Sequence, residues 1–471
     1  MDIFGLNKKK DSIALIDDET QLTYEELDLT VNELSKKISK RTLVALVANN
    51  TIGSIVVYLA CLKADAVILM LEKNVSENHL SFIIESYMPQ IIFSAKQLND
   101  TKMVDKCYEM LMQETVHGKI DINNELALLL STSGSTGSVK FIKISYDNII
   151  ANTKSIIDAL GVRQCDTVIT TLAMNYSYSL SIINTHLSVG AKIILNKSSV
   201  ITEDFWKKVE KYGVTTFGGV PYTYEMLDKL NLFPKSFSTL RYLTVAGGKL
   251  SEKTTLKICN YCKGNGMKFF SMYGQTEATA RIFILPWERA FDKLGSAGIP
   301  IPGGKAFLVD EHKNIILKPG KLGEIVYSGK NVTMGYALDY EDLGKGDTFN
   351  GTIETGDLAI QDDEGFFYIK GRKHHFVKIH GKRISLQDIE KMLTDKEIEA
   401  VCLQRNDFIY LFVVSCCEKY ENINALMYDI GITKRYYRII PIEAIPRQHS
   451  GKIRYAEFEK KIDIIENINQ L

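Results

Sequence analysis

The sequence has no excess of charge of either sign, because 57 lysines and arginines are balanced by 57 aspartates and glutamates. This balance gives no support for nucleic acid or an anionic membrane surface as a partner. Long apolar runs are also missing. Residues 55–71, the most apolar region, are interrupted by Lys63 and Asp65, and the first twelve residues lack a signal-peptide core. We therefore expect no membrane span, and we predict a buried helix followed by a strand at 55–71.

The eight cysteines are scattered, as is typical of a reduced, cytoplasmic protein. Cys259 and Cys262 form one C-x-x-C pair with no second pair and no nearby set of histidines. Two thiols packed on one helix are therefore favoured over a zinc or redox site. With 471 residues, of which 45% are hydrophobic, the chain can form two or three domains with a large core.

Apolar runs alternate with amphipathic segments before residue 295. Thr23 and Glu26 form the pattern of a capping box, which predicts a helix from Thr23 through Ile38. Strands are predicted at residues 43–48, 66–71, 91–94, 167–171, 191–195 and 240–245. Such alternation indicates parallel α/β layers. Between residues 295 and 369, short strands and Gly/Pro turns indicate a β-rich part, after which α/β character resumes.

Residues 131–140, STSGSTGSVK, follow the apolar run 126–130. Glycines let the backbone approach a ligand, and backbone N–H groups together with Ser and Thr hydroxyls bind phosphate oxygens. We therefore predict a nucleotide phosphate loop, although a Ser/Gly-rich surface loop is the simpler alternative for the segment alone. A Walker A loop does not match, because its lysine follows the second glycine directly, whereas Lys140 lies three residues after Gly137. A kinase or GTPase is thus disfavoured.

Two later segments supply further candidates for nucleotide binding. In residues 271–277, SMYGQTE, the Tyr273 ring could stack on a purine and the Glu277 carboxylate could hold a divalent cation that bridges phosphates. The alternative is a turn entering a helix, with Thr276 and Glu277 in its first turn. Asp357, in Thr-Gly-Asp before a predicted strand at 358–361, could accept hydrogen bonds from ribose hydroxyls, or it could be an ordinary turn residue.

Two basic segments follow. Residues 371–384, GRKHHFVKIHGKRI, could offer donors to an anionic ligand, or they could form a solvated linker. Residues 446–452, PRQHSGK, end in Lys452, which on its own would be interpreted as a surface lysine.

Taken in this order, the segments resemble the motifs of the adenylate-forming superfamily, which contains acyl-CoA synthetases, nonribosomal-peptide adenylation domains and luciferases. The resemblance runs from LTYEELDLTVNELSKKI near the N-terminus to SGKIRY near the C-terminus. It implies an α/β fold whose large N-terminal domain, residues 1–371, has layered α/β subdomains and a β-rich subdomain. A small, mobile C-terminal α+β domain, residues 372–471, would carry the catalytic lysine. It also implies adenylation of a carboxylic acid with ATP and Mg²⁺, followed by transfer to the pantetheine thiol of CoA or a carrier protein.

The resemblance also implies roles for individual residues. Those implied to contact ATP are Thr132, Ser133, Gly134, Ser135, Thr136, Gly137, Lys140, Gly247, Gly248, Tyr273, Gly274, Gln275, Thr276, Asp357 and Arg372. Thr136 and Glu277 would hold Mg²⁺, and together with Lys452 they are the implied catalytic residues. Lys452 would bridge the substrate carboxylate and the α-phosphate, where two anions meet and a cation is needed. The C-terminal domain would then rotate, so that residues 378–384 replace Lys452.

Three positions depart from the family pattern. The phosphate loop ends in Val139-Lys140-Phe141 instead of Pro-Lys-Gly, and Ser271 stands where asparagine is frequent. His374 stands where the hinge usually has aspartate. Because histidine titrates near neutrality, the effect of His374 on the hinge is left open.

Residues 171–191, TLAMNYSYSLSIINTHLSVGA, resemble the substrate-pocket strand and helix of the family. Members that activate amino acids usually place an aspartate there to pair with the α-amine, and this segment has no acidic residue. Because an unpaired buried ammonium is costly, an acid without an α-amine is favoured. Aryl or hydroxylated acids, medium acyl chains and small acids stay open. Candidates for the pocket, with core packing as the alternative for each, are Asn175, Tyr176, Ser177, Tyr178, Gly219 and Ala246.

The leading hypothesis is a cytoplasmic, AMP-forming acid–thiol ligase. The alternatives are transfer of the acyl group to an amine, a stand-alone amino-acid-activating domain, and a non-catalytic nucleotide-binding relative. The last is disfavoured by the retained set of Thr136, Glu277, Asp357, Arg372 and Lys452. No carrier domain is expected after Leu471, so a carrier protein would act in trans.

Overall fold

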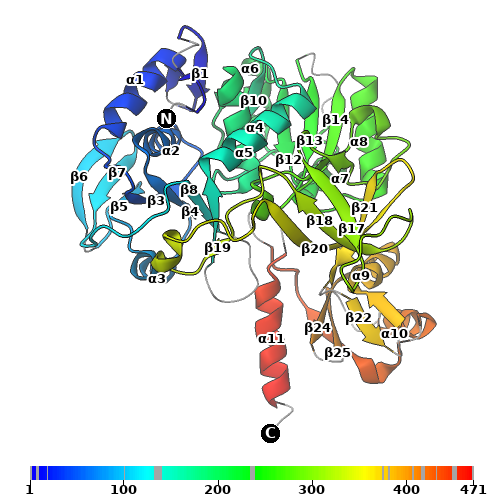
Figure 1. The fold of residues 1–471 in the computed structure, drawn as a ribbon. Coiled ribbons are helices and arrows are strands. Elements are labelled where there is room, and N and C mark those ends of the chain that lie inside the picture. Colours follow the sequence, from blue (N-terminus) through cyan, green and yellow to red (C-terminus); the bar gives the residue numbers. More distant parts are fainter. Residues whose placement is uncertain are drawn as a thin grey trace. The chain divides into compact units, whose positions relative to one another are not determined.

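The structure is a computed structural model, shown in Figure 1. It describes residues 3–6, 10–18, 20–99, 101–131, 140–233, 239–373, 376–379, 382–405, 408–414, 420–430, 432–447 and 453–468. Residues 132–139 of the predicted phosphate loop, His374 at the predicted hinge and the predicted catalytic lysine Lys452 lie outside the described residues.

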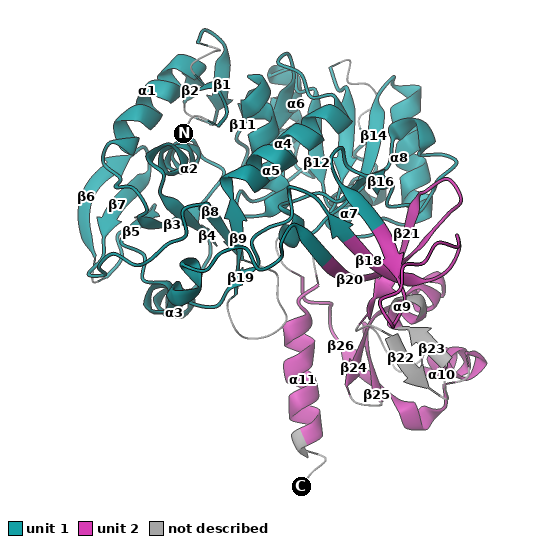
Figure 2. Cartoon of the chain, viewed as in Figure 1, with its two compact units in different colours: residues 1–134, 138–306, 327–353 teal, residues 135–137, 307–326, 354–471 magenta. Residues whose placement is uncertain are grey.

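The chain forms two compact units (Figure 2). Unit 1 comprises residues 1–134, 138–306 and 327–353, and unit 2 comprises residues 135–137, 307–326 and 354–471. The predicted domain boundary at residue 371 falls within unit 2, near the end of the strand β21 (Phe367–Arg372). A separate, mobile domain at 372–471 stays a prediction.

Unit 1 contains an eight-stranded and a nine-stranded sheet. The order of the eight-stranded sheet is β19 (Tyr336–Ala337), β9 (Phe141–Ser145), β8 (Leu126–Ser131), β4 (Val67–Glu72), β3 (Leu43–Ala48), β5 (Ile91–Ser94), β7 (Met110–Glu114) and β6 (Lys102–Cys107). The order of the nine-stranded sheet is β16 (Ile299–Pro300), β15 (Phe283–Ile284), β14 (Lys268–Tyr273), β13 (Tyr242–Val245), β12 (Thr216–Gly219), β10 (Thr167–Ile169), β11 (Lys192–Ile194), β1 (Ile13–Ile16) and β2 (Gln21–Thr23). The central strands of both sheets pair in parallel, as predicted.

Helices connect the parallel strands of unit 1 (Figure 1). They are α1 (Tyr24–Ser35), α2 (Ile52–Ala64), α3 (Glu77–Tyr87), α4 (Tyr146–Leu160), α5 (Ser177–Val189), α6 (Glu203–Lys211), α7 (Pro221–Lys229) and α8 (Glu252–Gly264). Residues 52–62 of α2 are all buried, as in a helix that is apolar on every side. One hydrophobic core cluster contains residues of α1, α2 and α5 together with strands of both sheets. Helices α4 and α5, packed against each other, frame the candidate site.

The sequence located most of these elements. Residues 43–48 and 91–94 are strands with the predicted bounds, and 55–71 contain the predicted buried helix and strand. The Thr23–Glu26 capping box is present, although α1 ends at Ser35, earlier than predicted. Cys259 and Cys262 are free, buried thiols on α8. Among the described residues, no helix has the length and apolarity that crossing a membrane requires.

The β-rich part predicted at 295–369 contains a four-stranded sheet in the order β17 (Lys305–Val309), β18 (Gly323–Ser328), β20 (Thr352–Gln361) and β21. The rest of unit 2 has the β22 (Phe376–Ile379) and β23 (Lys382–Ser385) hairpin and a three-stranded sheet of β24 (Glu399–Arg405), β25 (Phe408–Val414) and β26 (Tyr437–Ile442). Its helices are α9 (Leu386–Asp395), α10 (Tyr420–Asp429) and α11 (Tyr455–Ile468). The α/β class predicted from the sequence is confirmed.

Candidate functional site

Strands β8 and β9 flank the predicted phosphate loop. They pair antiparallel, and Ser131 is the register partner of Phe141, so the chain leaves and re-enters the sheet at neighbouring positions. Lys140, the last residue of the predicted loop, is half-buried. Its ammonium lies 4.1 Å from the centre of the Tyr336 ring, within the range of a cation–π contact. The end of β8–β9 thus places the loop lysine beside β19, which carries Tyr336.

Glu277, the predicted metal ligand, lies in a short 3-10 helix, Thr276–Ala278, after β14. Tyr336 donates a 2.9 Å hydrogen bond from its hydroxyl to Oε1 of Glu277. The Glu277 backbone carbonyl accepts hydrogen bonds of 3.0 Å from both the amide and the hydroxyl of Thr333. Glu277 is therefore held at its side chain and at its backbone, and Lys140, Tyr336 and Glu277 form one connected group.

The turn before Glu277 requires glycine. A Cβ on Gly274 would lie 1.9 Å from the carbonyl oxygen of Ala280, so a larger residue would displace backbone. The ring of the preceding residue, Tyr273, stacks on Phe283 at 5.5 Å between ring centres, and its hydroxyl accepts a 3.0 Å hydrogen bond from Nε2 of Gln275. Tyr273 and Gly274, which are predicted to pack on adenine, are therefore held by Phe283 of β15 and by residues of the segment between β14 and β15.

Two contacts join residues predicted to bind the nucleotide to residues predicted to bind the acid substrate. The hydroxyl oxygens of Ser177 and Thr276 are 3.3 Å apart. Gly247, which has a φ of +88°, has space for no side chain, because its Cβ would lie 2.3 Å from the hydroxyl oxygen of Tyr176. The start of α5 therefore meets both the turn after β13 and the turn after β14.

The remaining acid-pocket candidates have different surroundings. Tyr178 is buried and its hydroxyl is 2.7 Å from that of Thr244. Ala246 donates its amide to the carbonyl of Gly219 at 3.2 Å. A Cβ on Gly219 would meet side chains of the first turn of α7, and Gly248 lies against Pro221. Asn175 has a buried Oδ1 that accepts no hydrogen bond from the described residues.

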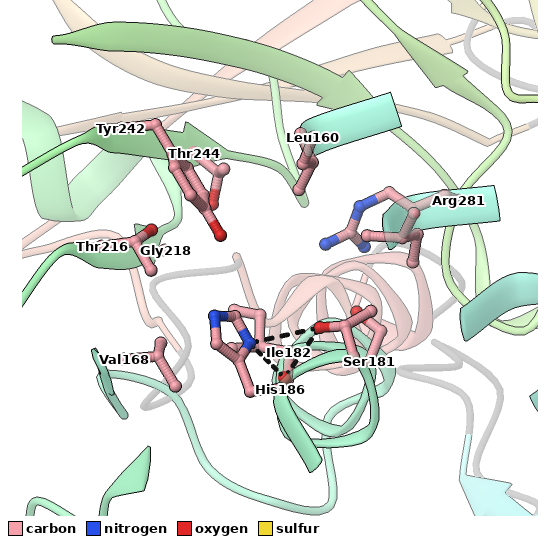
Figure 3. A pocket seen from close by; sticks show the side chains of 12 residues that line it. Leu160, Val168, Ser181, Ile182, His186, Thr216, Gly218, Tyr242, Thr244 and Arg281 are labelled. Atoms are coloured by element: carbon pink, nitrogen blue, oxygen red, sulfur yellow. Dashed lines mark hydrogen bonds between the residues drawn. The ribbon is translucent and has the colours of Figure 1, made fainter. Parts of the chain in front are cut away.

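A small cavity of about 10 Å³ lies beside Thr244 and Arg281, and Figure 3 shows it with its lining side chains. Arg281 contributes a guanidinium that is stacked on the Tyr178 ring, 4.1 Å from the ring centre. His186 lies about two turns after Tyr178 on α5. Its Nδ1 donates a 2.8 Å hydrogen bond to the carbonyl of Ile182, and its buried Nε2 has no hydrogen-bond partner among the described residues. Burial lowers the pKa of His186 to about 4, so its ring is neutral near pH 7.

Sequence reasoning missed Tyr336, Arg281 and His186. Tyr336 is 59 residues from Glu277, and no local pattern connects them. Arg281 did leave a signal, because it is a lone charge directly before the apolar run 282–285. His186 lies within the segment that resembles the substrate-pocket helix, two turns after the residues chosen from it.

In unit 2, Asp357 and Arg372 are brought together as the implied ribose site requires. Asp357 is a register partner of Arg372 in the β20–β21 pair, and Nε of Arg372 lies 3.3 Å from Oδ1 of Asp357. The Asp357 amide donates to the hydroxyl of Thr355 at 3.1 Å. Asp357 lies inside β20, and β20 begins at Thr352, so the strand is longer than the predicted 358–361.

The surroundings of Glu277 fit a divalent cation that arrives with a nucleotide. The described part of the chain has no group of three or more His, Cys, Asp or Glu side chains that could hold a metal. Mg²⁺ is commonly bound by one or two carboxylates together with phosphate oxygens and water. The single, oriented carboxylate of Glu277 fits that kind of site and does not fit a permanently bound metal.

Comparison with known proteins agrees with this arrangement. The family model described as AMP-binding enzyme matches residues 5–337. A 2-succinylbenzoate–CoA ligase of Bacillus pumilus is 28% identical over 81% of this chain and 79% of its own, and a medium-chain fatty-acid–CoA ligase of Escherichia coli is 24% identical over 98% and 89%. The solved structure of an O-succinylbenzoate coenzyme A synthetase from Bacillus subtilis in complex with AMP has a TM-score of 0.79 at 20% identity and covers 96% of both chains.

The match extends over more than half of the sequence, and the superfamily predicted from the motifs is confirmed, as is the predicted enzyme class of AMP-forming acid–thiol ligases. The chain belongs to the family of AMP-binding enzymes.

Proposed function

We propose that this protein activates a carboxylic acid with ATP as an acyl-adenylate and then transfers the acyl group to the thiol of CoA. The observation that carries the proposal is the junction in unit 1 where Ser177 meets Thr276 and Tyr176 meets Gly247. Residues expected to hold the acid there contact residues expected to hold the nucleotide. The two curated relatives described above are themselves named as CoA ligases.

In the first step, an oxygen of the acid forms a bond to the α-phosphorus of ATP, and the bond to pyrophosphate breaks. Both reactants are anionic, so positive charge is needed between them. Lys452 would supply it at the reacting oxygens, while Lys140 and the other loop residues, Thr136 included, would bind the outer phosphates. Glu277, held by Tyr336 and Thr333, would position Mg²⁺, which supplies charge neutralisation at the phosphates. Asp357 would accept hydrogen bonds from the ribose hydroxyls beside Arg372.

In the second step, the thiol sulfur forms a bond to the acyl carbon, and AMP leaves with the electrons of the broken anhydride bond. We propose that residues 372–471 act as a mobile lid between the two steps, with residues 378–384 replacing Lys452. A carrier protein acting in trans is the second acceptor to consider, and the cytoplasm is the proposed location, where ATP and CoA are both available.

The test is pyrophosphate release with a panel of aryl, hydroxy, fatty and amino acids, with hydroxylamine to trap the adenylate. Lys452→Ala should lower acid-dependent release by a factor on the order of 10² or more, as expected for the loss of a charge that acts in the transition state. Lys460→Ala, which removes an exposed lysine of α11, is the matched control and should release pyrophosphate at the wild-type rate. Equal release by both variants would contradict the assignment of Lys452.

The acceptor is identified from the products. With a preferred acid, wild-type protein is incubated with CoA, with a pantetheinylated carrier protein or with an amine, and the products are separated by mass. A CoA thioester is expected. An amide as the sole product would replace the proposed second step with amide formation, and activation of amino acids alone would contradict the inference drawn from the acid-free segment 171–191.

A further inference from the structure

We propose that the acid substrate carries a second negatively charged group, a terminal carboxylate, which binds to Arg281. This inference rests on the proposed function and names the substrate class of the same site. It concerns unit 1 alone, which contains both Arg281 and the residues expected to hold the acid.

Arg281 is buried, with 1% of its surface exposed. Its guanidinium stacks on Tyr178, Nη1 lies 3.3 Å from the carbonyl oxygen of Ala280, and Nε lies 3.3 Å from the sulfur of Met272. No carboxylate of the described residues forms an ion pair with it, and its electrostatic partners include the rings of Tyr178 and Tyr176. The positive charge of Arg281 is therefore buried without a charged partner among the described residues.

The charge of Arg281 is incompletely compensated. Removing a cation from water carries a large desolvation penalty even after the protein relaxes. A buried cation–π contact such as the one with Tyr178 offsets only part of that penalty. A carboxylate is the group that best completes such a site, because it neutralises the charge and matches the planar fork of guanidinium donors.

The cavity faces this guanidinium. Figure 3 shows the guanidinium of Arg281, the hydroxyl of Tyr242 and the ring of His186 directed toward one space between α5 and the strands β12 and β13. A volume of about 10 Å³ corresponds to one water-sized group, so the space admits one oxygen of a terminal carboxylate and is too small for a ring. The end of the acid remote from the reacting carboxylate is the part that would enter.

His186 can adjust to such a ligand. Its Nδ1–H donates to Ile182, which leaves Nε2 as the nitrogen directed into the cavity. Asp166 and Arg241 act on the ring electrostatically with opposite signs, and Arg281 and Tyr242 face it across the cavity. A carboxylate bound among these groups would favour protonation of Nε2, which would then donate to it.

The other end of the acid is placed by Tyr178. This ring contacts Arg281 on one side and meets the edge of Tyr176 at 6.3 Å between ring centres. The Tyr176 hydroxyl in turn lies against Gly247, and the adjacent Ser177 meets Thr276. An acid that extends along these tyrosines would have its reacting carboxylate near the predicted nucleotide contacts and its terminal group at Arg281. An amine at that terminus would be repelled, and a hydroxyl would leave the charge uncompensated.

The test compares acids of equal carbon number that differ only in a second carboxylate: straight-chain mono- and dicarboxylic acids, and arylalkanoic acids with and without a ring carboxylate. The readout is kcat/KM for pyrophosphate release. Wild type should prefer the dicarboxylic acid of the best-fitting pair by at least tenfold. Arg281→Met should reduce that preference to near unity, because truncating one partner of a buried charge pair is costly, and the loss should appear mainly in KM for the dicarboxylic acid. Arg281→Lys should retain part of the preference, and Arg289→Met, at a half-buried arginine that does not line the cavity, should retain all of it.

Thermal unfolding of wild type with each acid gives a second readout that does not depend on turnover or on the folding of Arg281→Met. A larger upward shift with dicarboxylic than with monocarboxylic acids supports the inference. A preference for monocarboxylic or hydroxy acids, or an acid preference that is the same in Arg281→Met as in wild type, would overturn it while the proposed function stands. Wild-type protein that releases pyrophosphate with no acid would overturn the proposed function and the inference together.

Discussion

The hydroxyl of Tyr336 donates a 2.9 Å hydrogen bond to Oε1 of Glu277, and the same ring lies beneath the ammonium of Lys140. One tyrosine of a two-residue strand at the edge of a sheet therefore contacts both charged groups that the motifs assign to phosphate and metal binding. The carboxylate owes its orientation to a residue that no motif includes.

Tyr336→Phe should preserve the fold and weaken the use of Mg²⁺. Loss of a group that orients a metal ligand typically costs 10- to 100-fold in metal affinity or activity, and we expect about tenfold for this exchange. The measurement is pyrophosphate release as a function of Mg²⁺ concentration, with Tyr340→Phe in the neighbouring turn as the control. An unchanged Mg²⁺ dependence would mean that the hydrogen bond is not needed for metal binding.

Gly274→Ala should destabilise unit 1 and abolish adenylation, because the added methyl would collide with the backbone of Ala280. We expect a loss of at least about 2 kcal/mol in unfolding free energy, as for other substitutions that overfill a packed site. Gly264→Ala is the matched control, since its Cβ would meet nothing within 4 Å. Denaturant unfolding followed by the fluorescence of Trp206 and Trp287, both in unit 1, measures the effect. Equal stability of the two variants would refute the steric argument.

Arg241→Met should destabilise unit 1 by about 3 kcal/mol, the range seen when one partner of a buried ion pair is removed. Asp166 is almost fully buried and receives hydrogen bonds of 2.9 and 2.6 Å from the Arg241 guanidinium. Burial alone would raise the pKa of Asp166, but the hydrogen bonds from Arg241 and from the Arg163 amide hold it below its usual value. The pair of half-buried Arg289 and exposed Asp292 supplies the control, because Arg289→Met should cost less than 1 kcal/mol. The unfolding curves of Arg241→Met and Arg289→Met would coincide if the ion pair of Asp166 and Arg241 had no structural role.

The free energy of unfolding of unit 2 should fall as the pH rises from about 4.5 to about 7, because Glu390 loses its proton. Burial raises the pKa of Glu390 to about 7, although its carboxylate accepts a 2.7 Å hydrogen bond from the Cys402 amide. The folded state therefore binds this proton more tightly than the unfolded chain, so the stabilisation present below the unfolded pKa is lost as the pH passes through the folded pKa, by about 3 kcal/mol in all.

Hydrogen exchange in the paired strands β24 and β25 measures this loss directly. Glu390→Gln should flatten the pH dependence between pH 5 and 8, while Glu421→Gln, at an exposed position of α10, should leave it as in wild type. An equally steep dependence in Glu390→Gln would assign the effect to another group.

Local sequence patterns predicted the helices and strands. The candidate site, in contrast, is formed by contacts between residues that are distant in the sequence. Residues 43–48 could be bounded correctly because an apolar run between turn residues reads as a buried strand whatever surrounds it. The end of α1 was misjudged by three residues, since helix ends carry weak signals. Ser177 and Thr276 were each predicted to lie in a ligand-facing segment, but their direct contact depends on parallel strand order, which spacing along the chain does not encode.

The missing part of the prediction is electrostatic. No role was predicted for Arg281, because its burial and its contact with Tyr178 join segments that are distant in the sequence. The absence of acidic residues from 171–191 was taken to favour a substrate without an α-amine. Arg281 adds a buried positive charge beside Tyr178 of α5, which no count of acidic residues could have indicated.

The pairing of Ser131 with Phe141 allows turnover and thermal stability, which are usually linked, to vary independently. The β8–β9 ladder already holds both ends of the intervening segment. The pairing of these strands therefore compensates for the entropic cost of closing the segment, and this cost rises only slowly with the number of residues in it. Substitutions and even insertions between these two residues should therefore alter turnover while leaving the melting temperature nearly constant. This hairpin is a place where catalytic variation can accumulate with little consequence for folding.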